Sequence, residues 1–164
     1  MPTFSFDIVS SYDKAEMSNV FAQTEREIAT RYDFKGTPAS IEWMNDKTGF
    51  KLTGANEWQL DAILDIVRKK LASREQSSKV LDLTRQKVES NLKATWEVSF
   101  KDGLPQEDAK KLTALLRADA PKVKAQIQGD EVRVTSASKD ELQKAIRLLE
   151  SADVDRPLQF INFR

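Results

Sequence analysis

The 164-residue sequence contains no cysteine and no histidine. These two absences exclude disulfide bonds, a cysteine nucleophile, metal sites built from thiolate or imidazole ligands, and catalytic triads that need histidine. Carboxylates, lysine, tyrosine and hydroxyl groups remain available, as does an oxygen-ligated metal such as magnesium. The absence of cysteine also agrees with a cytoplasmic location.

An excess of charge of either sign is missing too, because 26 basic residues balance 26 acidic ones. Balanced charge argues against a protein that coats nucleic acid by bulk charge, so a nucleic-acid contact needs a local basic patch. No hydrophobic run approaches the ~20 residues of a membrane span. The opening MPTFSFDIVSS also lacks the basic region and long apolar core of a secretory signal. We therefore expect a cytoplasmic protein without a membrane partner.

The composition, 40% hydrophobic and 32% charged, is that of an ordinary globular protein. Its hydrophobic periodicity predicts two successive copies of one pattern: strand, helix, strand, strand, helix, strand. In the first copy, Asp13 is expected to cap a helix with Glu16 at the capping-box position, and Asn56 to cap a second helix. Alternation predicts strands at residues 4–10, 39–43, 49–53 and 80–83.

The second copy begins with an alternating strand at residues 95–100, followed by a helix that starts at Pro105. Gly129-Asp130 is a hairpin signal between strands at 122–128 and 131–135. Ser138 caps the last helix, and residues 157–164 form the closing strand. The polar stretch 84–91 lacks a clear period and is interpreted as a linker between the copies.

Two βαββαβ patterns predict an α+β protein of two ferredoxin-like α/β sandwiches. Each would be an antiparallel sheet with two helices on one face. The expected domains are residues 1–86 and 87–164. In the alternative arrangement, the N-terminal strand joins the second sheet and makes that domain discontinuous.

Three stretches of the chain resemble the YajQ family of bacterial proteins: FSFDIVS at 4–10, KVKAQIQGDEVRVT at 122–135 and LQFINFR at 158–164. Residues 27–35, EIATRYDFK, resemble the junction between a helix and a strand in that family. The resemblance implies a cytosolic nucleotide-binding protein with two sandwiches that have the topology of RNA-recognition domains. It extends the candidate ligands to RNA, including tRNA, and to cyclic dinucleotides. It brings no firmly established catalytic activity.

RNA-recognition domains stack bases on aromatic side chains that project from the exposed sheet face. Here the expected third strands, residues 49–53 and 131–135, lack that aromatic signature, so the fold is expected without the stacking platform. Trp43, Trp58 and Trp96 are interpreted as core or partly buried anchors.

The first candidate nucleotide-binding cluster lies on the polar side of the hairpin in the second copy. It consists of Lys122, Lys124, Gln126, Gln128 and Arg133. Cationic side chains can neutralise phosphates, and glutamine amides can pair with base edges. The simpler interpretation is a solvated strand face, which antiparallel sheets commonly present to water.

A second candidate cluster, at the end of the first helix, consists of Arg31, Tyr32, Phe34 and Lys35. The arginine and the aromatic side chains could hold a base while Lys35 meets a phosphate. The simpler interpretation is a helix C-terminus whose cations complement the helix dipole and whose aromatic side chain enters the core.

The remaining catalytic route is a magnesium site built from Asp7, Asp33, Asp82 or Glu97. Their spacing matches no metal loop, and no phosphate-binding glycine loop occurs, so we expect no enzyme and no cofactor. The leading hypothesis is a non-catalytic nucleotide- or RNA-binding protein with a regulatory role. The alternative is a protein–protein interaction module that docks partners through exposed sheet faces or edges.

Overall fold

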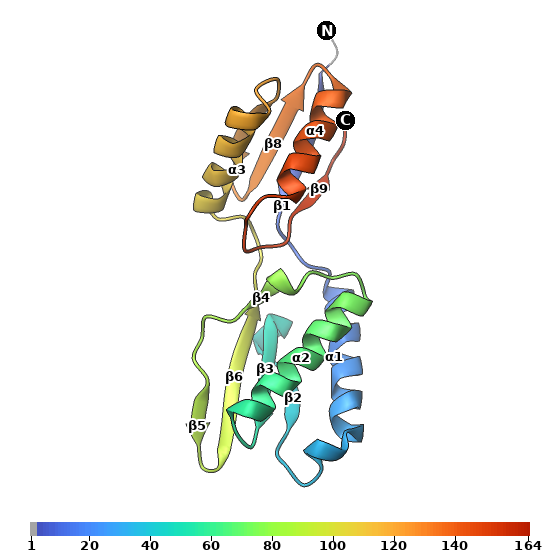
Figure 1. Cartoon of the computed structure of the whole chain (residues 1–164), viewed down its shortest axis with the longest axis vertical. Helices are drawn as coiled ribbons and strands as arrows, with labels where there is room; N and C mark the ends of the chain where they lie inside the picture. Colours follow the sequence, from blue (N-terminus) through green and yellow to red (C-terminus); the bar gives the residue numbers. More distant parts are fainter. Residues whose placement is uncertain (1–2) are drawn as a thin grey trace. The chain divides into compact units, whose positions relative to one another are not determined.

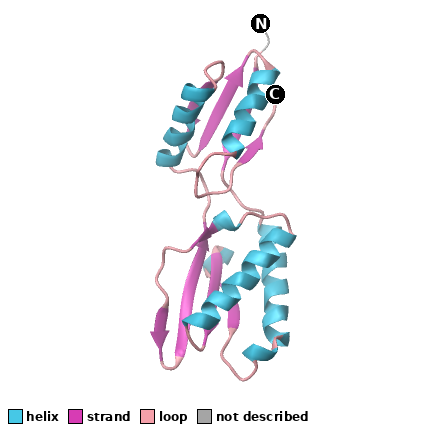
Figure 2. Ribbon diagram, in the orientation of Figure 1, coloured by secondary structure: helices cyan, strands magenta, loops and turns pink. Residues whose placement is uncertain are grey.

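The computed structural model describes residues 3–164, which contain four α-helices and two antiparallel sheets (Figures 1 and 2). The chain divides into two compact units. The inserted unit is Tyr12–Lys101, and the discontinuous unit combines Met1–Ser11 with Asp102–Arg164. The α+β class with two α/β sandwiches is therefore confirmed.

The discontinuous unit has the βαββαβ order, interrupted after its first strand by the inserted unit. Its elements are β1 (Phe4–Val9), α3 (Gln106–Asp119), β7 (Lys124–Gln128), β8 (Glu131–Ser136), α4 (Lys139–Glu150) and β9 (Gln159–Ile161). The strands lie in the antiparallel order β7-β8-β1-β9. α3 and α4 lie against one face of this sheet (Figure 1), where Phe6, Ile8, Val132 and Val134 are buried.

The inserted unit has its own five-stranded sheet and two helices. Its elements are α1 (Lys14–Thr30), β2 (Ser40–Trp43), β3 (Gly49–Gly54), α2 (Glu57–Ser73), β4 (Leu81–Asp82), β5 (Val88–Ser90) and β6 (Lys93–Phe100). The strand order is β2-β3-β6-β4, and β5 pairs with β6. β6 therefore occupies the same position in this sheet as β1 does in the other sheet. The order of the elements along the chain is that of a circular permutation of the βαββαβ topology.

The division of the chain differs from the expected boundary between residues 86 and 87. β6, expected to open the second sandwich, lies between β3 and β4, while β1 pairs with β8 and β9. The alternative expectation, with the N-terminal strand in the second sheet, describes this pairing of β1. Alternating apolar residues specify that a strand has one buried face, but they do not specify which sheet buries it. The expected linker at 84–91 also contains β5.

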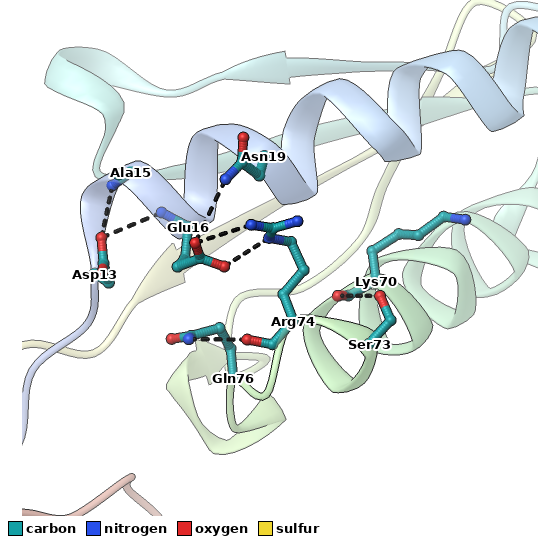
Figure 3. A network of polar contacts seen from close by, with 8 residues as sticks. All are labelled: Asp13, Ala15, Glu16, Asn19, Lys70, Ser73, Arg74 and Gln76. Atoms are coloured by element: carbon teal, nitrogen blue, oxygen red, sulfur yellow. Dashed lines mark hydrogen bonds and ion pairs between the residues drawn. The ribbon is translucent and has the colours of Figure 1, made fainter.

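The two helix caps predicted for the inserted unit, Asp13 and Asn56, are both observed. The Asp13 carboxylate caps α1 by accepting from the amides of Ala15 and Glu16, at 2.9 and 3.2 Å. The Asn56 side chain caps α2 by accepting from the amide of Gln59 at 3.0 Å. The Glu16 carboxylate pairs across the unit instead of completing a capping box (Figure 3).

An ion pair joins Glu16, near the start of α1, to Arg74, the C-cap residue that follows α2 (Figure 3). The Arg74 guanidinium donates to both oxygens of Glu16, with Nε–Oε2 at 2.6 Å and Nη2–Oε1 at 3.1 Å. Asn19 adds a longer hydrogen bond to Oε1. The hydrogen bonds from Arg74 are the main cause of a lowered pKa for Glu16, against partial desolvation, which raises it.

We expect Glu16→Gln to lower the melting temperature of the inserted unit at pH 7 and to reduce its sensitivity to acid. Because the folded pKa of Glu16 is lowered, its stabilising effect is present above the unfolded pKa of about 4.3 and is lost as pH falls through the folded value. Thermal unfolding at pH 7 and pH 3.5 measures both effects. Glu25→Gln, exposed on the same helix, is the control, and equal effects of the two substitutions would contradict the assignment.

Candidate functional site

The sheet of the discontinuous unit has an open face, formed by the side chains that point away from α3 and α4. Alternation fixes these positions, because neighbouring residues of a strand face opposite sides of the sheet. The open face consists of Ser5, Asp7 and Val9 on β1, Glu131, Arg133 and Thr135 on β8, Lys124, Gln126 and Gln128 on β7, and Gln159 and Ile161 on β9.

A polar row crosses the open face perpendicular to the strands. Gln126 pairs in register with Arg133, which pairs in turn with Asp7. Arg133 Nε donates to Asp7 Oδ1 at 3.0 Å, and Asn162 Nδ2 donates to Asp7 Oδ2 at 2.9 Å. Asp7 is only 3% exposed, whereas the Arg133 side chain is 33% exposed. The buried carboxylate therefore orients an arginine that still reaches solvent.

Both members of this pair are charged at neutral pH. The hydrogen bond from Arg133 is the largest cause of the lowered pKa of Asp7, and it outweighs the burial that would raise it. Asn162 and the nearby charge of Arg164 lower this pKa further. Glu131 also lies on the open face, opposite Gln128. The open face therefore carries charges of both signs. Lys124 is exposed on it and pairs in register with Thr135, so no carboxylate lies directly opposite this lysine.

Four of the five residues in the first predicted cluster come together on this face. Lys124, Gln126 and Gln128 are exposed along β7, an edge strand, beside Arg133. Lys122 lies outside the strand, in the turn before β7, where its side chain is exposed. The Lys122 carbonyl accepts a hydrogen bond from the Ser136 hydroxyl at 3.2 Å, which ties that turn to β8.

The second predicted cluster lies in the inserted unit, just after α1. The Arg31 guanidinium donates to both Asp33 oxygens, at 3.0 and 2.7 Å, and lies 4.7 Å from the centre of the Phe34 ring. Phe34 is 5% exposed and packs in the core, so Arg31 and Phe34 contact one another instead of facing an open gap. Lys35 is exposed and lines a pocket of about 260 Å³ that also contacts Phe34 and Ile28.

Two aromatic side chains of this unit are strongly exposed. Tyr32, a member of the second predicted cluster, is 87% exposed, and Trp58 is 86% exposed in the first turn of α2. The expectation that Trp58 is an anchor in the core is wrong. The helical period carries the missing signal, because Trp58 lies opposite the buried α2 stripe that includes Leu60 and Leu64.

Metal-binding clusters and membrane-spanning helices are both absent from the described part of the chain. Across residues 3–164, no acidic side chains gather in a group of three or more that could hold a metal ion. None of the helices in that range has the length and apolar character needed to cross a bilayer.

Comparison with known proteins gives the family. The family model described as "Nucleotide-binding protein YajQ-like" matches residues 4–164. A protein from Nocardioides sp. is 45% identical over 165 residues, and one from Mycobacterium avium is 42% identical over 167, each match covering both chains in full. A protein from Thermobifida fusca is 42% identical over 98% of this chain and 97% of its own. All three carry the name "Nucleotide-binding protein". The resemblance found in the sequence is thereby confirmed, and the chain belongs to the family of YajQ-like nucleotide-binding proteins.

Proposed function

We propose that this protein binds a nucleotide or RNA without catalysing a reaction on it, through the open face of the discontinuous unit. The names of its relatives support the ligand class. The observation that carries the proposal is the placement of Arg133. A buried carboxylate, Asp7, holds it half-exposed in register with exposed Gln126. An oriented guanidinium loses less conformational freedom when it meets a phosphate or a base edge.

The chemistry of the face favours phosphate contacts and hydrogen bonds over base stacking. Lys124 can meet a phosphate as a point charge, and the Gln126 amide can pair with a base edge. None of the open-face side chains defined above is aromatic, so the stacking that gives RNA-recognition domains much of their affinity has no counterpart there. We therefore propose salt-sensitive binding with little base preference, to single-stranded RNA, tRNA or a cyclic dinucleotide.

The main test of this function replaces Lys124 with glutamate. We expect Lys124→Glu to weaken binding of a fluorescent single-stranded RNA decamer. We also expect it to make the slope of log K against log salt concentration shallower by about 0.7 for each phosphate that the variant no longer neutralises. Fluorescence anisotropy at several salt concentrations measures both quantities.

Lys110→Glu is the matched control, because Lys110 is exposed on α3, which covers the other face of the same sheet. Identical affinity and salt slope for Lys124→Glu and wild type would contradict the open face as the site. If the wild type binds no nucleotide or RNA at all, the proposed ligand class fails.

The alternative function, a protein–protein interaction module, has one specific observation in its favour. Val88 and Leu92 are exposed apolar side chains at the β5–β6 hairpin, and Leu92 has a positive φ of 64°. Such a hairpin edge can receive an added strand from a partner. Capture of partners from cell extract with and without nuclease separates the two functions, because partners held through nucleic acid disappear on treatment.

A further inference from the structure

The inserted unit contains a pocket that neither candidate cluster includes. It has a volume of about 310 Å³ and lies between the start of α1 and the loop that follows β2. Its lining combines apolar and aromatic side chains with charged ones, among them Met17, Trp43, Lys14, Asp46 and Lys47.

An aromatic wall gives this pocket a fixed shape. The Trp43 ring stacks on Phe21, with centres 4.8 Å apart and planes 18° from parallel, and it also packs on Phe50 at 5.1 Å. Met17, beside it in the lining, is buried in the same core. An indole anchored on two rings cannot swing away. Phe21 covers one of its faces and the flexible Lys47 side chain lies over the ring from the other side, so a planar ring that packs on Trp43 must displace Lys47 from that face.

Two lysines border the pocket from different elements. Lys14 is the first residue of α1, and Lys47 lies in the loop after β2; both are exposed. Lys47 Nζ is 5.4 Å from the centre of the Trp43 ring. Among the described residues neither lysine makes an ion pair, so both charges remain available to an anion. Asp46 contributes one opposing charge and one acceptor.

The loop that carries Lys47 is held in an unusual conformation. Asp46 and Lys47 have φ angles of 54° and 58°, in the left-handed region that is unfavourable for residues other than glycine. The Met44 amide donates to the Gly49 carbonyl at 2.8 Å, and the Thr48 hydroxyl donates to the Asn45 carbonyl at 2.8 Å. These bonds fix the backbone of the loop that carries Lys47.

We infer that this pocket binds a single nucleotide, with the base packed against Trp43 and the phosphate between Lys14 and Lys47. Its volume lies at the lower end of the range for ligand pockets, roughly 300–1,000 Å³. That size suits a mononucleotide and is too small to enclose a dinucleotide. The Asp46 carboxylate can accept from an amino or hydroxyl group of the same ligand. This site lies in a different unit from the open face and does not depend on it.

The test titrates the full-length protein with AMP, GMP, CMP and UMP and follows the three tryptophan indole N–H signals by NMR. We expect at least one mononucleotide to shift the Trp43 signal saturably and to leave Trp58, the exposed indole, unmoved. Lys14→Glu combined with Lys47→Glu should weaken that binding at least about tenfold, equivalent to 1.4 kcal/mol. Lys69→Glu combined with Lys110→Glu, two exposed lysines elsewhere, is the control of equal charge and should change it little.

Ribose 5-phosphate and the corresponding nucleoside complete the design, because each lacks one half of the proposed contacts. Both should bind more weakly than the mononucleotide. The inference is overturned if no mononucleotide shifts Trp43, if only Trp58 responds, or if ribose 5-phosphate binds as tightly as the nucleotide. The Lys124→Glu variant should bind mononucleotide at this pocket like the wild type, so failure of the open-face function and failure of this pocket give different results.

Discussion

Replacing Gly49 with alanine is expected to destabilise the inserted unit by about 3 kcal/mol or more, since overpacking against an unyielding backbone lies at the upper end of its usual range. Gly49 is buried at the start of β3. An alanine Cβ there would overlap the carbonyl oxygen of Val98 and lie 2.7 Å from Ser99 Cα and from Met44 Sδ. β3 cannot retreat from β6 without breaking the ladder between them.

Urea unfolding followed by tryptophan fluorescence measures this effect, because all three tryptophans lie in the inserted unit. Gly36→Ala is the control. Gly36 has a φ of +75°, but a Cβ there meets nothing within 4 Å, so the loss should be only about 1–2 kcal/mol from the left-handed backbone. Equal losses in the two variants would show that close contact with β6 does not govern the Gly49 position.

Replacing Asp7 with asparagine is expected to lower the free energy of unfolding of the discontinuous unit by roughly 2 kcal/mol at pH 7, the usual size for a hydrogen bond to a charged group. The pKa of Asp7 is lowered in the fold. Its contribution is therefore present above the unfolded pKa of about 3.9 and is lost as pH falls through the folded value. The wild type should lose stability below about pH 4, and the difference from the variant should shrink there.

Chemical unfolding by circular dichroism at pH 7 and at pH 3 measures this prediction, with tryptophan fluorescence reporting the inserted unit separately. Asp119→Asn, at an exposed position at the end of α3, should change stability by no more than about 0.5 kcal/mol. A constant gap between Asp7→Asn and wild type at both pH values would mean that the Asp7 charge is not what stabilises the unit.

Most elements of the fold could be predicted from the sequence, because helices, strands and their caps depend on neighbouring residues. Strand pairing could not be predicted in the same way. Phe4 pairs with Ser136, and Lys93 pairs with nearby Ser90. No local pattern distinguishes these cases, because β1 and β6 show the same alternation of apolar and polar residues. The exchange of these two strands between sheets is the one large difference from the expected topology.

The candidate site also has some features that depend on neighbouring residues and others that depend on long-range pairing. The exposure of Lys124, Gln126 and Gln128 follows from strand parity, which is a local property, and the sequence predicts it. The pairing of Arg133 with Asp7 was not predicted, because Asp7 lies on the strand assigned to the other sheet. The pocket around Trp43 was missed for a similar reason, since its lining joins two segments separated by most of α1 and β2.

The insertion of one unit within the other sets the order in which the sheets can form during protein synthesis. Of the strands that the structure describes, β1 leaves the ribosome before all others, yet its partners β8 and β9 follow only after the whole inserted unit. At roughly 5–20 residues per second, β1 waits several seconds or more for them, while every strand of the inserted unit becomes available. During that interval Phe4, Phe6 and Ile8 form an unpaired apolar strand edge. The nascent chain therefore passes through a period of exposure to aggregation that lasts until its C-terminal third has been translated.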